Sequence, residues 1–352
     1  MIKPLTSLRM IFALMVFGAH CYVIDDLFNA HVFKEGFVGV NFFFVLSGFI
    51  IAYNYHDQFA EHKVTKRSFW IARFARIYPL HWLTLLVAVF VGGFAFKDGV
   101  LDWLSHFLAS FTLTQGFIPK MDYFFSFNSP SWSLCCEQLF YISFPFVISK
   151  VKSGKKLFLF LLACGALMIS AMHFTPEDAI RGYWYVNPIT RFPDFLVGIL
   201  LLNIYNRLKD KEISFRKGTL YEIGSILFFI AFYLYSAEIP KVYRYSVYYW
   251  IPVAAILLVF ALQKGWVSKL LCNKILFIGG EISFGFYLIH LFVIDAFMTW
   301  QKGSSLQIGW ELSIPLIFLI TIILSSISYT YFEKPMNKWV KEKLGYKRKI
   351  QD

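Results

Sequence analysis

Charged residues are scarce in this chain. Only 16% of its 352 residues are Asp, Glu, Lys or Arg, whereas soluble domains carry about 25%. Hydrophobic residues make up 58% of the chain and aromatic residues 20%. A water-soluble core of that size would need far more polar surface to enclose it. The composition therefore argues against a soluble globular protein.

The sequence also lacks the common signatures of metal, disulfide and hydrolase sites. Its five cysteines lie in or beside apolar segments, and their spacing fits neither a metal site nor a disulfide framework. It contains no GxSxG elbow, no HExxH pair and no glycine-rich phosphate loop. The first apolar run lacks a small-residue cleavage site, so we expect it to be retained as a span. No metal is expected.

Long apolar runs are what the sequence has instead. Their lengths are close to the roughly 20 residues that a helix needs to cross a bilayer. They predict an all-α, polytopic transmembrane bundle of about ten spans in one domain, 1–352, with a basic tail at 336–352. The polar residues in segment 101–118 predict an interfacial or re-entrant helix there. The predicted spans are 8–24, 37–55, 78–96, 131–149, 157–174, 189–206, 219–236, 247–263, 275–297 and 309–332.

The distribution of Lys and Arg predicts the orientation of these spans. With a cytoplasmic N-terminus, 25 of the 34 Lys and Arg fall in cytoplasmic segments and eight fall outside. Cytoplasmic loops are normally enriched in these residues. Both termini are therefore expected in the cytoplasm. The same distribution argues against nucleic-acid binding as the reason for the net charge of +12, because the cations do not gather on one domain.

Ionisable residues inside the predicted spans are the first candidates for a functional site. Arg9 and His20 are 11 residues apart, which puts them on one helix face about 16 Å apart. Glu137, near the start of the fourth span, and His290, near the end of the ninth, are expected in the same outer layer as His20. A carboxylate at that depth could orient an imidazole. Each residue could instead be a structurally paired core residue.

Further candidates lie in or beside other spans. Arg191 and Asp194 open the sixth span and could pair with each other or serve the site. Arg73 and Arg76 lie in the cytoplasmic segment 56–77, where arginine forks suit phosphates. They could also be ordinary positive-inside charge or contacts to anionic lipid. For Ser47 in the second span, helix packing is the simpler interpretation.

Taken together, these residues resemble the acyltransferase-3 family of membrane O-acyltransferases over nearly the whole chain. At position 41 the family often has Asp, whereas this chain has the neutral Asn41. The matching motifs are Arg9 to His20, Gly39 to Gly48, Arg73-Phe-Ala-Arg76, Trp132 to Glu137, Tyr287-Leu-Ile-His290 and Phe332-Glu-Lys-Pro335.

The resemblance implies a multi-pass enzyme of the bacterial inner membrane. Its members move an acyl group, usually acetyl, from cytoplasmic acyl-CoA to a hydroxyl of an extracytoplasmic glycan such as lipopolysaccharide O-antigen or exopolysaccharide. Acetyl-CoA would be a co-substrate, and no permanently bound cofactor is implied. The chain resembles the stand-alone type, without a fused esterase-like domain.

These expectations give a hypothesis for the site. Arg73 and Arg76 would hold the phosphates of acyl-CoA. His20 would act as general base on the acceptor hydroxyl or would itself be acylated. Glu137 would orient His20, and Arg9 would support the donor channel. The remaining candidates for substrate binding or support are His290, Ser47, Asn41, Trp132, Arg191 and Asp194.

Two other classes of protein remain open on the sequence alone. A transporter or glycan flippase could also use intramembrane Arg, His and Glu, although no pair of Gly- or Pro-broken repeat spans is evident. A scaffolding protein is disfavoured by the ionisable residues within the spans. Aromatic residues in the outer segments, such as Tyr185 and Tyr243, could stack on a sugar or anchor the chain at the membrane interface.

Overall fold

The computed structural model describes residues 2–91, 99–151 and 153–347. These residues form helices and connecting turns, with no strand among them. The prediction of an all-α, multi-pass helical bundle is therefore confirmed. The end of the predicted third span at 92–96 and the last residues of the basic tail, 348–352, lie outside the described residues.

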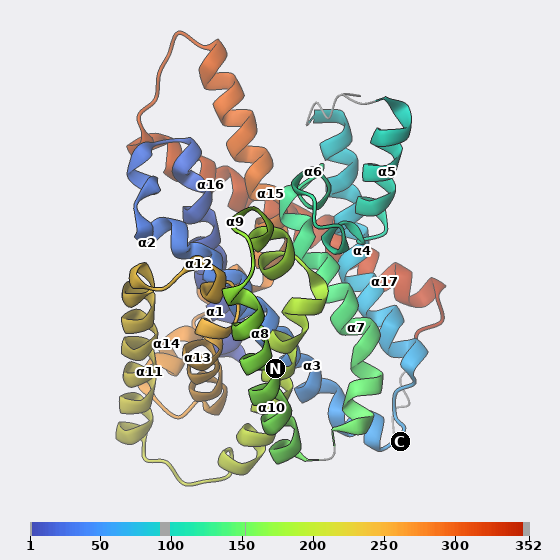
Figure 1. Cartoon of the computed structure of the whole chain (residues 1–352), viewed down its shortest axis with the longest axis vertical. Coiled ribbons are helices and arrows are strands. Elements are labelled where there is room, and N and C mark those ends of the chain that lie inside the picture. The colour runs from blue at the N-terminus through green and yellow to red at the C-terminus, as the bar shows by residue number, and fades with distance from the viewer. Residues whose placement is uncertain (1, 92–98, 152, 348–352) are drawn as a thin grey trace.

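Ten long helices overlap the ten predicted spans within the described residues (Figure 1). Seven of the helical segments are long and apolar enough to cross a membrane by length and composition. Helices α7, α10 and α13 would complete the count of ten, which stays a prediction. The long helices are α1 Lys3–His20, α3 Val38–Ala60, α4 Lys66–Val91, α7 Trp132–Lys150, α8 Gly154–His173, α10 Pro188–Leu208, α11 Phe215–Tyr235, α13 Trp250–Leu262, α15 Lys274–Gly303 and α16 Trp310–Ile327.

Short helices fill most of the connections. Helix α5 has 12 residues, which corresponds to about 18 Å and is too short to cross a hydrocarbon core of about 30 Å. This agrees with the prediction of a non-spanning helix within 101–118. The short helices are α2 His31–Lys34, α5 Val100–Phe111, α6 Met121–Phe124, α9 Glu177–Ile180, α12 Lys241–Arg244, α14 Trp266–Leu271 and α17 Lys334–Lys343.

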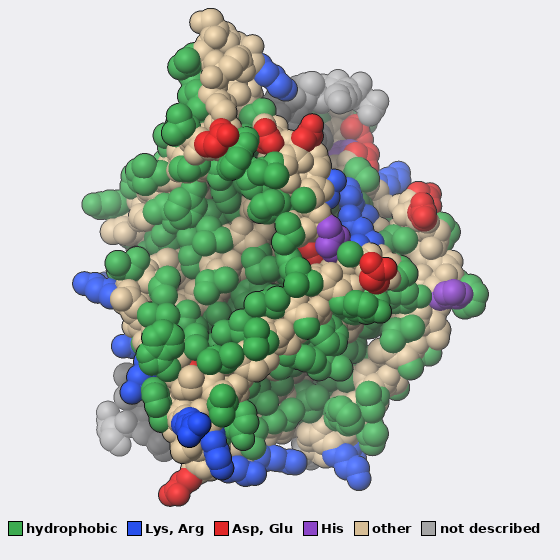
Figure 2. Space-filling model, turned by 90° about the vertical axis from the view of Figure 1, so that its left-hand side faces the viewer, with side chains coloured by type: hydrophobic (Ala, Val, Ile, Leu, Met, Phe, Trp, Pro, Cys, Tyr) green, Lys and Arg blue, Asp and Glu red, His purple; other side chains and the backbone are tan. Residues whose placement is uncertain are grey.

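The two ends of the bundle differ in the way that the charge pattern predicts. Helices α2, α5, α6 and α9 come from segments expected outside, and they lie in the upper half of Figure 1. The α3–α4 and α10–α11 connections, expected inside, lie at the lower end. Figure 2 shows a broad hydrophobic band on one face with Lys and Arg side chains along its lower edge. The cytoplasmic location of both termini stays a prediction.

Glycines bring the central helices together. A Cβ atom at Gly48 on α3 would collide with the Phe195 carbonyl on α10, and one at Gly280 on α15 would collide with the Thr6 carbonyl on α1. Small residues of this kind permit close helix packing in membranes. The close contact of α1 with α15 sets the position of the helix that carries His290 relative to the one that carries His20.

Candidate active site

An open cavity of about 300 Å³ lies in the half of the bundle that the charge pattern predicts to face the cytoplasm, and it is called the inner cavity below. Arg9, Ser47, Arg73, Arg76 and Glu137 line it from helices α1, α3, α4 and α7. Helix α4 begins at Lys66, so the two arginines predicted in a loop before the third span lie on the helix itself. Glu281 also lines the cavity, so its cationic side is the one formed by α4, which suits a phosphate-bearing ligand.

The two arginines of α4 have different partners. Arg73 lies 3.4 Å from the hydroxyl of Tyr55, and its guanidinium lies 5.7 Å from the centre of the Tyr141 ring. Arg76 lies 3.6 Å from a carboxylate oxygen of Glu333. Within the described part of the chain, no carboxylate lies within 4.0 Å of Arg73. Arg73 is therefore the better placed of the two to bind an anion.

Sequence reasoning missed the role of Glu333. This residue belongs to the segment Phe332–Pro335, which carried the family resemblance but no assigned function. In the structure it lies at the end of the π-helical turn Ser328–Glu333 and is largely buried beside Arg76. An acid directly after the last span, in a strongly basic tail, was the available signal.

A second, smaller cavity of about 60 Å³ adjoins the first and extends towards the outer side. Arg9 and Glu137 line both cavities, and Ser133 and Tyr287 line the second. Glu137 accepts a hydrogen bond of 2.9 Å from the Tyr141 hydroxyl. No described side chain forms an ion pair or hydrogen bond with Arg9. The two cavities thus share Arg9 and Glu137, whereas the smaller one is lined mainly by apolar side chains.

His20 and His290 meet at the outer end of this region. Nε2 of His290 lies 3.0 Å from Nδ1 of His20, and Nδ1 of His290 lies 3.2 Å from the Phe286 carbonyl. The Tyr287 ring centre is 6.0 Å from that of His290. The structure thus brings together two candidates from opposite ends of the sequence, and places them about one helical turn beyond the smaller cavity.

The expected position of Glu137 beside His20 is wrong. The start of α7 is already deep in the bundle, because the Tyr287 hydroxyl donates to the Pro130 carbonyl, just before this helix. Glu137 is seven residues further inward than Pro130, or about 10 Å of helix rise. It therefore shares a layer with Arg9 and not with His20 and His290.

Arg191 and Asp194 pair with each other, which is one of the two interpretations that the sequence allowed. Both are fully buried, and their side chains are 2.9 Å apart. Arg191 also donates to Asn41 Oδ1 at 2.6 Å, and Asp194 accepts from Ser246 at 2.6 Å. The neutral amide of Asn41 thus serves as an acceptor for a guanidinium that already has a carboxylate partner.

Trp132 and Ser47, the other two candidates, make no ion pair among the described residues. Trp132 is buried, with its ring 4.5 Å from that of Tyr185. Ser47 lines the inner cavity, whereas its neighbour Gly48 makes the tight helix contact. The expected packing function therefore belongs to the glycine.

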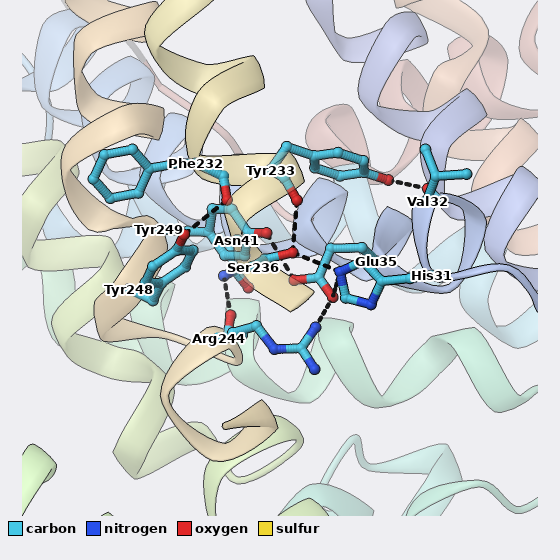
Figure 3. Close-up of polar contacts among 10 residues, drawn as sticks. All are labelled: His31, Val32, Glu35, Asn41, Phe232, Tyr233, Ser236, Arg244, Tyr248 and Tyr249. Atoms are coloured by element: carbon cyan, nitrogen blue, oxygen red, sulfur yellow. Dashed lines mark hydrogen bonds and ion pairs between the residues drawn. The ribbon is translucent and has the colours of Figure 1, made fainter. Parts of the chain in front are cut away.

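A polar cluster on the outer side was not predicted. The carboxylate of Glu35 accepts from Arg244 and from the Tyr249 hydroxyl, the latter at 2.7 Å (Figure 3). His31 lies one turn before Glu35 and is 2.8 Å from the Ser236 hydroxyl. The cluster links the segment after α1 to α11, α12 and α13. The sequence offered little signal, because Glu35 falls between two apolar runs and looks like an exposed loop residue.

Comparisons with known proteins agree with the family resemblance. A family model described as an acyltransferase domain matches residues 4–330. Acyltransferase MdmB of Streptomyces mycarofaciens is 30% identical over 83% of this chain and 79% of that protein. Peptidoglycan O-acetyltransferase OatA of Listeria monocytogenes is 27% identical over 87% of this chain, which spans only 52% of that protein. No solved structure matches.

Proposed function

Because the chain belongs to the acyltransferase-3 family of membrane acyltransferases, we propose that it transfers an acyl group from cytoplasmic acyl-CoA to a hydroxyl of an extracytoplasmic glycan. Acetyl is the proposed acyl group, with acetyl-CoA as co-substrate. The proposed acceptors are lipopolysaccharide O-antigen or exopolysaccharide, and the name of OatA adds peptidoglycan. The proposed location is the bacterial inner membrane.

The observation that carries the proposal is the pair of adjoining cavities. The larger begins at Arg73 and Arg76, on the side predicted to be cytoplasmic, and the smaller reaches Tyr287, one turn below His290. The phosphates of acyl-CoA would bind at Arg73. The pantetheine arm would extend past Arg9 and Glu137, which would bring the thioester towards His20.

At the outer end, His20 would remove the proton from the acceptor hydroxyl. The oxygen would attack the thioester carbonyl, so that a carbon–oxygen bond forms as the carbon–sulfur bond breaks. The proton held by His20 would then pass to the CoA thiolate. In the second route, His20 attacks the thioester first and CoA leaves as its thiolate. The acceptor hydroxyl then attacks the acyl group, its proton passes to the thiolate, and the bond to His20 breaks. Both routes require a lone pair on the same imidazole.

The proposal is tested with purified protein reconstituted in vesicles. Acyl transfer from labelled acetyl-CoA to the glycan fraction is measured for the wild type and for His20→Ala. We expect the variant to lose transfer but to keep its thermal stabilisation by coenzyme A. Saturation at a hundredfold excess over Kd corresponds to about 2.7 kcal/mol.

The rival function, a transporter or flippase without acyl-transfer chemistry, gives a different result. Such a protein would show no stabilisation by coenzyme A, and its transport would not consume acyl-CoA. Wild-type transfer rates in His20→Ala would also contradict the proposal. Mass analysis of surface glycans from cells with and without the chain would identify the acyl group and the acceptor together.

A further inference from the structure

The buried imidazole of His290 has a defined tautomer. Its Nδ1 lies 3.2 Å from the carbonyl oxygen of Phe286. A carbonyl can only accept a hydrogen bond, so Nδ1 must carry the proton. In a neutral imidazole the other nitrogen, Nε2, then has a lone pair and can only accept.

This tautomer determines that of His20. Nε2 of His290 is 3.0 Å from Nδ1 of His20, and one of these two nitrogens must be the donor. Since Nε2 of His290 accepts, Nδ1 of His20 carries the proton. The lone pair of His20 therefore lies on its Nε2.

The surroundings favour the neutral pair. The ring of His290 has the rings of Phe17, Phe286 and Tyr287 within 6.2 Å, measured between centres. Among the described residues, no carboxylate contacts either imidazole. Each ring therefore has the other as its polar side-chain partner. The backbone carbonyl of Val16 also accepts a hydrogen bond from His20, so His290 and Val16 together set the orientation of His20.

We propose that His290 is a positioning residue that holds His20 in its Nδ1–H tautomer, so that Nε2 of His20 is the atom that takes the acceptor proton or attacks the thioester. This inference rests on the proposed function of His20. When Nε2 becomes protonated, the bond from Nδ1–H to His290 also stabilises the imidazolium. The arrangement thus resembles the hydrogen bond that orients a catalytic base in other enzymes.

The test compares two substitutions of similar size. His290→Phe keeps a ring among aromatic neighbours but removes the acceptor, and we expect kcat to fall about 100-fold with an unchanged KM for acetyl-CoA. His290→Gln can present its amide oxygen to Nδ1–H of His20, so most of the rate should return. His173→Gln, at the exposed end of α8, is the matched control.

A spectroscopic measurement separates positioning from general structural support. In ¹⁵N-histidine-labelled protein, the His20 signals are assigned by their loss in His20→Ala. The proton should be on Nδ1 in the wild type and in His290→Gln, and should redistribute to Nε2 in His290→Phe. A wild-type proton on Nε2, or full activity of His290→Phe, would overturn the inference. Full activity of His20→Ala would instead overturn the proposed function, while the tautomer stays measurable.

A separate observation concerns cations on the outer side. Arg181 begins the turn that follows α9, and Lys241 and Arg244 are the first and last residues of α12. Separately, Figure 2 shows Lys and Arg side chains in the upper half of one face. Arg244 is paired with Glu35. In the described ranges, no carboxylate lies within 4.0 Å of Arg181 or Lys241. The two cations are close enough to repel each other as like charges.

Aromatic rings lead inward from these cations. The ammonium of Lys241 is 5.8 Å from the centre of the Tyr245 ring, and Arg181 interacts with the hydroxyl of the same tyrosine. The Tyr245 ring is 4.6 Å from that of Tyr185, which in turn contacts Trp132. Tyr245 and Trp132 are buried, so these rings support the two cations from within the bundle and leave their charged groups available to an anion.

The cationic group is also close to the outer part of α1. Arg244 pairs with Glu35, and the next residue, Gly36, packs so tightly against Met15 and Ala19 that a Cβ atom there would collide with the Met15 carbonyl. His20 directly follows Ala19 in the sequence. The cations therefore lie on the side of the bundle from which the proposed acceptor would approach.

We further infer that Arg181 and Lys241 bind a carboxylate or phosphate group of the glycan acceptor. The inference rests on the proposed extracytoplasmic acceptor, but its test measures binding and does not depend on acyl transfer. The probes are a hexuronic-acid disaccharide, a sugar phosphate and neutral maltose. Thermal stabilisation of the detergent-purified full chain is measured with each.

We expect stabilisation by at least one anionic probe and not by maltose. The double variant Arg181→Gln with Lys241→Gln should lose it, whereas Arg73→Ala, which removes a cation of the inner cavity, should keep it. The probe that stabilises identifies the anionic group as carboxylate or phosphate. Equal stabilisation of wild type and double variant would overturn the inference. Displacement of the probe by phosphatidylglycerol would overturn it in favour of a lipid headgroup site.

Discussion

Arginines of the inner cavity and arginines nearer the outer side differ in whether they form an ion pair with a carboxylate. Arg9 and Arg73 line an open cavity, and neither has a carboxylate within ion-pair distance among the described residues. Arg191 and Arg244 instead pair with Asp194 and Glu35. Burying an unpaired cation is costly, so an open site with unpaired arginines is suited to an anionic ligand. The paired arginines are suited to holding helices and loops together.

The largest expected effect tests the structural half of this comparison. Arg191→Leu leaves Asp194 buried without its ion partner, and we expect a loss of about 3–5 kcal/mol of folding free energy. Unfolding in denaturant or yield of folded protein measures this loss. The double variant Arg191→Leu with Asp194→Leu should lose less, because no unpaired charge remains. A double variant as unstable as the single one would show that the pair is not the cause.

Arg73 tests the ligand-binding half. Arg73→Ala should raise the KM for acyl-CoA by about 10- to 100-fold, since a hydrogen bond to a charged group contributes about 1.5–3 kcal/mol. Thermal stability without ligand should be nearly unchanged, because no carboxylate loses its partner. Initial rates over a range of acetyl-CoA concentrations measure the effect. A change confined to the acceptor dependence would contradict binding of the donor at this arginine.

Substitution of Arg76 should both raise the KM for acyl-CoA and lower the stability of the fold, each by less than the two variants above. Arg76→Ala removes a cation from the cavity wall but also leaves Glu333 without its partner at 3.6 Å. We expect a smaller rise in KM than for Arg73→Ala, together with a measurable loss of thermal stability. Adding Glu333→Gln should restore the stability and leave the KM raised. If both losses were reversed together, Arg76 would act only through Glu333.

Sequence reasoning identified the helices and most of the site because both depend on local patterns. The Arg9–His20 spacing and the apolar runs are readable along one helix. The depth of Glu137 in the bundle could not be predicted from the sequence, because it depends on how far the chain before α7 enters the bundle. In that segment, Gln115 donates to the Ser131 hydroxyl and Asn128 donates to the Leu288 carbonyl, each at 3.2 Å, so these side chains find partners inside the protein. A hydropathy profile does not show that a polar residue has a hydrogen-bond partner elsewhere in the fold.

The paired acids were hidden for a related reason. Glu35 and Glu333 lie just outside apolar runs, where an acid normally faces solvent. Their partners Arg244 and Arg76 are more than 200 residues away in the sequence. No spacing rule on one helix can therefore pair them. The same limit applies to His290, whose contact with His20 follows from the packing of α15 on α1.

The smallest expected effect tests whether the outer side also holds unpaired cations for a ligand. Burial, together with Arg181 and Arg244, lowers the pKa of Lys241, against an opposing effect of Glu35. The ammonium is charged below its pKa, so affinity for an anionic probe should decline as the pH rises and should begin to do so below the usual range for lysine. Thermal stabilisation by the hexuronic-acid disaccharide between neutral and alkaline pH measures this. In Lys241→Gln the remaining affinity for the probe should no longer depend on pH in this range. An unchanged pH profile would show that Lys241 takes no part in binding. The unpaired cations of the outer side that correspond to Arg73 would then be other residues.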